Sequence, residues 1–170
     1  MELKQWLDEF SRLHARARKG ELTPAEGASY RNRRDELARA LVTAQRLTVL
    51  PGQTPRQALR VTRALQIDLD LAGGRVRAMT QNISTGGFGA LLGQTPKENE
   101  AIGFTLKQPG GTEPIVGRCR VRDIQTRAGN HLVSFMFEDL PEESRERIEM
   151  TIFDTVMEQF EGTAPPPKKK

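Results

Sequence analysis

The spacing of apolar residues changes near residue 61, and this change divides the chain into two parts. Up to residue 47, apolar side chains recur every three or four positions, which is typical of amphipathic helices. From Val61 onward they alternate with polar residues, most clearly in the run Ile67-Asp-Leu-Asp-Leu71. Such alternation buries one face of a strand and leaves the other face in water. The sequence therefore predicts an α+β chain, with its helices first.

The first fifty residues predict two helices joined by a short connection. Residues 2–19 form the first helix, and one stripe of it carries Leu3, Trp6, Phe10, Leu13 and Ala17. The second helix starts at Thr23-Pro-Ala-Glu26, where Thr23 can cap the helix and Glu26 completes a capping box, and it runs to about Leu47. Two helices connected in this way form an antiparallel hairpin. Its apolar stripe needs a partner, which could be the rest of the chain, a second copy or another protein.

The β part predicts six short strands separated by turns rich in glycine and proline. The expected strands lie at residues 61–71, 75–82, 88–92, 102–106, 115–123 and 132–137. Six strands at this spacing favour a small antiparallel barrel. Pro141 opens a last helix that we expect to lie across the barrel. The predicted division is a helical hairpin at 1–50, a linker at 51–60, the barrel with its C-terminal helix at 61–160, and a disordered basic tail at 161–170.

Composition and charge exclude several classes of protein. The apolar runs are too short to cross a bilayer, which takes about 20 residues, and the charged N-terminus does not resemble a signal peptide. The single cysteine, Cys119, cannot form an internal disulfide and is expected in the core. These features predict a cytoplasmic protein that does not enter a membrane. The net charge of +4 comes mostly from residues 1–50, which carry 10 Lys/Arg and 7 Asp/Glu. The barrel part therefore lacks the dense basic face that a general polyanion binder needs.

Two short polar segments carry the candidate chemistry. Arg56 and Arg60 lie four residues apart where the linker meets the barrel, and Asn82-Ile-Ser84-Thr-Gly-Gly87 follows one strand later. Guanidinium groups match phosphates, stack on bases and match the O6/N7 edge of guanine. The Asn82 carbonyl can accept a hydrogen bond from a guanine N–H, Ser84 can reach a phosphate or a base edge, and Gly87 permits a tight turn. Taken singly, each segment is also an ordinary solvated or turn sequence.

Taken together and in this order, the two segments resemble the PilZ domain family over roughly residues 55–160. The resemblance implies a six-stranded PilZ-like barrel with a C-terminal helix and a receptor for cyclic di-GMP, with no other cofactor and no metal. It implies that the residues contacting the ligand are Arg56, Arg60, Asn82, Ser84 and Gly87. Asn82 stands where the family more often has Asp, and Ser134 lies near a position where many members have glycine.

The predicted function is a cyclic di-GMP receptor that changes conformation on binding and signals to an unidentified protein partner. As a hypothesis, residues 51–60 are mobile without ligand, wrap the ligand when it binds, and so reposition the helical hairpin. The main alternative is a constitutive PilZ-like adaptor, or an oligomerisation protein pairing through its N-terminal helices, that ignores nucleotides. Nucleic acid is the least favoured partner. The second helix has a basic side, but such a side is more often solvated than used to bind DNA; it carries Arg31, Arg33, Arg34 and Arg39. No pattern of catalytic residues is apparent, so the chain is not expected to be an enzyme.

Overall fold

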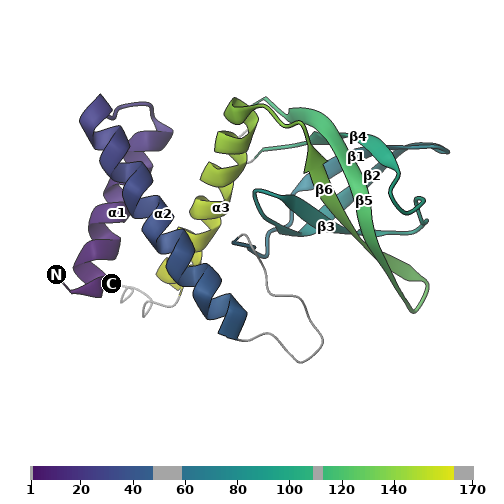
Figure 1. Cartoon of the computed structure of the whole chain (residues 1–170), viewed down its shortest axis with the longest axis horizontal. Coiled ribbons are helices and arrows are strands. Elements are labelled where there is room, and N and C mark those ends of the chain that lie inside the picture. The colour runs from purple at the N-terminus through teal and green to yellow at the C-terminus, as the bar shows by residue number, and fades with distance from the viewer. Residues whose placement is uncertain (1, 48–58, 109–112, 163–170) are drawn as a thin grey trace, which may run out of the picture. The chain divides into compact units, whose positions relative to one another are not determined.

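A computed structural model of the chain describes residues 2–47, 59–108 and 113–162. The chain forms two compact units, Met1–Leu59 and Arg60–Lys170. The first unit contains α1 (Leu3–Arg18) and α2 (Pro24–Leu47), joined by a short connection as predicted (Figure 1). The predicted limits of the linker and of the tail fall largely outside the described residues, so that part of the division stays a prediction.

An aromatic cluster holds the helical hairpin together. The Phe10 ring stacks between its neighbours, with its centroid 5.7 Å from that of Trp6 and 5.6 Å from that of Tyr30. His14 Nδ1 lies 2.6 Å from the Tyr30 hydroxyl. The buried face of α1 is thus centred on Phe10 and His14, whereas Leu3, at the start of the predicted stripe, is 72% exposed.

The buried polar side chains of this unit include His14 and Arg34. His14 is only 6% exposed, and its burial, with smaller contributions from Arg18 and Arg34, lowers its pKa from 6.5 to about 4. Arg34 is 4% exposed, and its guanidinium lies 5.1 Å from the centre of the Tyr30 ring. The expectation of a solvated basic side on the second helix is therefore wrong for Arg34, which packs against an aromatic face instead.

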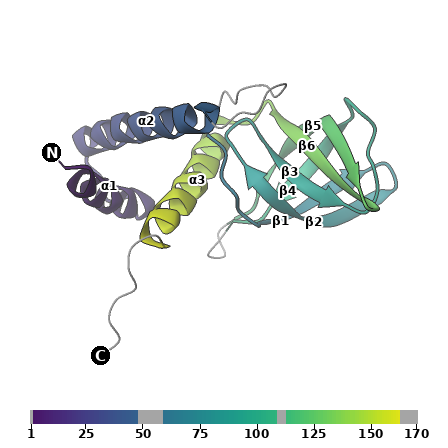
Figure 2. The same cartoon turned by 90° about the horizontal axis from the view of Figure 1, so that it is seen from below.

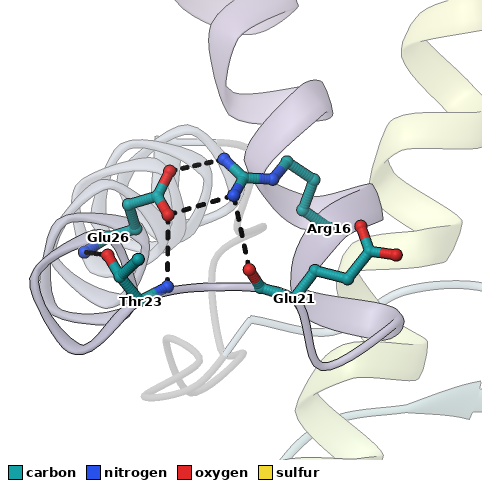
Figure 3. Close-up of polar contacts among 4 residues, drawn as sticks. All are labelled: Arg16, Glu21, Thr23 and Glu26. Carbon is teal, nitrogen blue, oxygen red and sulfur yellow. Dashed lines mark hydrogen bonds and ion pairs between the residues drawn. The ribbon is translucent and has the colours of Figure 1, made fainter.

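The connection between the helices is fixed by the predicted capping box (Figure 3). The Glu26 N–H donates to Thr23 Oγ1 at 3.2 Å, and the Thr23 N–H donates to Glu26 Oε1 at 3.1 Å. Arg16 on α1 donates to both carboxylate oxygens of Glu26 and, at 3.3 Å, to the Glu21 carbonyl. The bonds from Arg16, with those within the capping box, hold the pKa of Glu26 at about 2. One carboxylate therefore caps α2 and ties it to α1.

The second unit is a closed antiparallel barrel, as predicted (Figure 1, Figure 2). Its strands are β1 (Gln66–Leu71), β2 (Gly74–Ile83), β3 (Gly87–Leu92), β4 (Ala101–Leu106), β5 (Ile115–Arg127) and β6 (Asn130–Glu138). Around the barrel they follow the order β1-β2-β3-β6-β5-β4, and pairing of β1 with β4 closes it. Inward side chains alternate with outward ones along β1 and β4, as the period of two in the sequence requires.

Four phenylalanines fill the inside of the barrel, and the lone cysteine lies buried among the inward residues. The ring centroids of Phe88 and Phe135 are 4.8 Å apart, and those of Phe104 and Phe137 are 5.3 Å apart. Cys119 is fully buried, which confirms the core position expected for it, and burial raises the pKa of its thiol to about 12. A thiol that stays protonated in an apolar interior contributes to core packing and does not act as a nucleophile.

The last helix, α3 (Glu142–Gly162), follows β6 and buries an apolar face that includes Ile148 and Ile152. Polar side chains fasten it to the segments between β4 and β5. The Thr151 hydroxyl donates to Gln108 Oε1 at 2.7 Å, and Arg147 donates to the Glu113 carbonyl. None of the described helices combines the length and the apolar character that crossing a membrane requires.

Candidate functional site

The short segment before β1 lies beside the end of β2 and brings Arg60 to the predicted turn. Val61 and Ile83 form an isolated antiparallel bridge, with N–H···O distances of 3.0 and 2.9 Å in the two directions. Both side chains point into the core. Antiparallel pairing therefore places Arg60 opposite Ser84, which is buried at 7% exposure. Arg60 is half-buried at this place.

A buried threonine interrupts the first strand and anchors this segment. β1 begins at Gln66, not at Val61 as expected, because Thr80 on β2 takes over the hydrogen bonds of the chain before it. The Thr80 hydroxyl donates to the Arg63 carbonyl at 2.6 Å and accepts from the Leu65 N–H at 2.9 Å. The Thr80 side chain is 1% exposed, so this pair of bonds is shielded from water. The chain leading to Arg60 is thus fixed to the strand that carries Asn82.

The turn between β2 and β3 is held by its own polar groups. The Ser84 N–H donates to the Gly87 carbonyl at 2.8 Å, and the Gly86 N–H donates to Ser84 Oγ at 3.2 Å. The Gly86 carbonyl accepts from the Phe137 N–H at 2.9 Å, which ties the turn to β6. The Ser84 hydroxyl is therefore held in place by the turn itself.

Gly87 is needed because β3 and β6 approach each other closely. A Cβ at this position would lie 1.9 Å from the Phe135 carbonyl oxygen, which is part of the β6 backbone. The close approach seen at Gly87 is therefore between two strands. Whether a ligand also approaches its backbone stays a prediction.

Asn82 presents an acceptor that lacks a donor. The register of β2 against β3 shifts between Thr80 and Asn82, so the chain bulges at Gln81 and Asn82 comes to lie opposite Gly89. Asn82 Oδ1 is buried, and among the described residues no donor lies within hydrogen-bond distance of it. A buried acceptor without a donor typically costs about 1–3 kcal/mol, so such groups usually take a donor from another residue, from water or from a ligand.

Four of the five predicted site residues therefore gather at one end of the barrel: Arg60, Asn82, Ser84 and Gly87. Arg56 lies outside the described residues, and its predicted role stays a prediction. Sequence reasoning missed Thr80, which anchors the segment before β1, and Gly89, which lies opposite Asn82. A threonine at an inward position of β2 and a second glycine two residues after Gly87 were the available signals.

Arg120 is a further arginine of the barrel, and its bonds are made within the protein. Arg120 on β5 donates to the Glu138 carboxylate on β6 and to the Asn99 carbonyl, so it belongs to the barrel wall. In the ranges 2–47, 59–108 and 113–162, no three His, Cys, Asp or Glu side chains are placed to hold a metal ion.

The PilZ domain family model matches residues 54–154 of the chain. Among solved structures, YcgR of Escherichia coli in complex with c-di-GMP is similar at 21% identity and a TM-score of 0.56, over 63% of this chain and 48% of that chain. The PilZ domain of YcgR with c-di-GMP matches at 19% identity and a TM-score of 0.54, over 64% of this chain and 97% of that one. The Bacillus subtilis inhibitor of motility (MotI) matches at 17% identity and a TM-score of 0.53, over 64% of this chain and 53% of that chain.

At these identities the likeness to solved structures is one of fold. The chain matches only about half the length of MotI and of full YcgR. No curated protein matches the chain.

Proposed function

The chain belongs to the PilZ domain family, and on this basis we propose that it is a receptor for cyclic di-GMP that signals to a protein partner. The observation that carries the proposal is the convergence of Arg60, Asn82 and Ser84, with Asn82 Oδ1 buried and without a donor among the described residues. That acceptor is covered in the free chain, and a ligand N–H that displaces the covering groups would supply the missing donor.

Guanine supplies the donors that this acceptor needs. Its N1–H and its 2-amino group both donate, and adenine has neither at the same edge. Arg60 is half-buried next to Ser84, where its guanidinium can bind a phosphate or lie against a base. A cyclic dinucleotide with two guanines and two phosphates combines these features, and Arg56 would add a second guanidinium.

The proposal also includes an effect on a partner. The boundary between the two compact units falls between Leu59 and Arg60, so one of the proposed ligand contacts begins the barrel unit. Ligand that orders residues 51–60 would therefore change how the helical hairpin is presented, either to another protein or to a second copy. Hydrogen exchange with and without ligand tests this step: equal protection of residues 51–60 in both states contradicts it.

Calorimetry on the full chain tests the binding step. We expect cyclic di-GMP to bind with a dissociation constant in the micromolar range or below, and cyclic di-AMP to bind much more weakly. Arg60→Ala and Asn82→Ala should each weaken binding about 10- to 100-fold, since hydrogen bonds to charged groups or unpaired buried acceptors contribute roughly 1.5–3 kcal/mol. Arg127→Ala is the matched control, because that exposed arginine lies at the far end of β5.

A well-folded chain that gives no heat with cyclic di-GMP would overturn the proposal and favour the adaptor alternative. Equal weakening by Arg60→Ala and Arg127→Ala would show that charge alone, and not the site, attracts the ligand.

A further inference from the structure

Gly89 faces Asn82 across the pairing of β2 with β3. A Cβ at position 89 would lie 2.9 Å from Asn82 Nδ2, 3.0 Å from Oδ1 and 3.3 Å from Cγ. The carboxamide of Asn82 therefore occupies the space that a side chain at position 89 would fill. The described glycines with positive φ are Gly20, Gly74 and Gly129, so Gly89 is required by space and not by backbone conformation.

The alternation of β3 places this glycine on the outer face of the barrel. Phe88 and Ala90, on either side of it, point inward and are buried. Gly89 points outward, where the bulge at Gln81 also directs Asn82. The Asn82 amide thus packs against the β3 backbone at Gly89, and this backbone contributes to the burial of Oδ1.

We propose that Gly89 is a positioning residue for ligand recognition: by lacking a side chain, it holds the Asn82 amide in the orientation that accepts from guanine. This inference rests on the proposed function, and it concerns a residue that is not itself expected to touch the ligand. It separates two glycines that look alike in the sequence. Gly87 makes room for the backbone of β6, and Gly89 makes room for one functional side chain.

The two glycines should respond differently to an added methyl group. At Gly87 the obstacle is the Phe135 carbonyl in the β6 backbone, which cannot move without disturbing the barrel. At Gly89 the obstacle is the far end of the Asn82 side chain, which can rotate away. Gly89→Ala should therefore fold normally, and it should gain slightly in stability because alanine restricts the unfolded chain.

The experiment compares Gly89→Ala with Gly93→Ala, a control at a described glycine where an added Cβ meets no atom within 4 Å. We expect Gly89→Ala to weaken cyclic di-GMP binding about tenfold or more without lowering the unfolding temperature. Gly93→Ala should bind as the wild type does. Binding by Gly89→Ala within twofold of the wild type would overturn the inference and leave the proposed function intact.

A double-mutant cycle shows whether the effect passes through Asn82. In an Asn82→Ala background, Gly89→Ala should weaken binding no further, since the displaced amide is already absent. Equal weakening in both backgrounds would mean that Gly89 acts by another route, which contradicts the proposal.

A ligand-free measurement separates this inference from the proposed function. The side-chain amide resonances of Asn82 in NMR spectra of the free chain should shift strongly in Gly89→Ala and stay in place in Gly93→Ala. Unchanged resonances in Gly89→Ala would refute the positioning role even if the wild type binds cyclic di-GMP. Shifted resonances with a wild type that binds nothing would support the positioning of Asn82 and overturn its role toward guanine.

Discussion

The buried His14 should make the helical hairpin sensitive to mild acid. Its pKa is about 4 in the folded chain against 6.5 when unfolded, chiefly because burial disfavours the charged ring. With the ring neutral, the Tyr30 hydroxyl can donate to Nδ1 across 2.6 Å. Protonation removes that acceptor and places a positive charge near Arg18 and Arg34.

The sign and size of the effect follow from these two pKa values. Between pH 6.5 and pH 4 the unfolded chain binds more protons than the folded one, so stability falls as the pH falls. The full stabilisation is present above pH 6.5 and is lost as the pH drops toward 4. At about 1.4 kcal/mol for each unit of pKa difference, the total is roughly 3 kcal/mol, of which about 2 kcal/mol is already lost by pH 5.

Trp6 fluorescence during urea unfolding measures this loss, because Trp6 is the only tryptophan of the chain and stacks on Phe10. Unfolding at pH 7.5 and pH 5.0 should differ by about 2 kcal/mol in the wild type. The control is His14→Asn, in which the amide oxygen can replace Nδ1 as acceptor and does not titrate. The ionisation of Glu26 does not interfere, since its pKa of about 2 places its protonation below this range. The same loss in wild type and His14→Asn would refute the argument.

Three further changes test the packing described above. Gly87→Ala should destabilise the barrel by about 3 kcal/mol or more, or prevent folding, because its Cβ would collide with the Phe135 carbonyl; thermal unfolding followed by circular dichroism checks this. Thr23→Ala should cost the helical hairpin about 1 kcal/mol through loss of the cap, whereas Thr43→Ala, near the C-terminal end of α2, should cost less in the same urea titration. Cys119 should react with a thiol reagent only after unfolding, since it is buried and its pKa is about 12; rapid labelling of the native chain would contradict this.

The fold could be predicted because its determinants are local. The capping box at Thr23 and Glu26 fixes the start of α2 through neighbouring residues alone. The strands could be placed by a period of two and by glycine-rich turns. The start of β1 could not, because the alternation from Val61 onward continues through a place where the Thr80 hydroxyl replaces ladder hydrogen bonds. A bond between a side chain and a distant backbone leaves no periodic pattern in the sequence.

In the candidate site, too, local features could be predicted and contacts between distant residues could not. Arg60, Asn82 and Ser84 could be proposed from residue type and spacing, because phosphate and guanine need particular donors and acceptors. Gly89 could not, because the Asn82 amide that occupies the space beside it comes from the neighbouring strand. The buried Arg34 escaped prediction for a similar reason. An arginine on a helix is usually solvated, and the Tyr30 ring that lies against Arg34 comes from packing that residue type does not reveal.

Closure of the barrel has a consequence for how this chain can associate. In the described part of the chain, each strand pairs with a neighbour on both sides, and pairing of β1 with β4 leaves no open edge. Edge strands are where proteins add a strand from a partner and where sheets aggregate. A partner of this barrel must therefore bind through contacts with side chains and not by pairing with a strand backbone. Aggregation by strand pairing would first require two neighbouring strands of the barrel to separate, so resistance to it should follow the stability of the closed barrel.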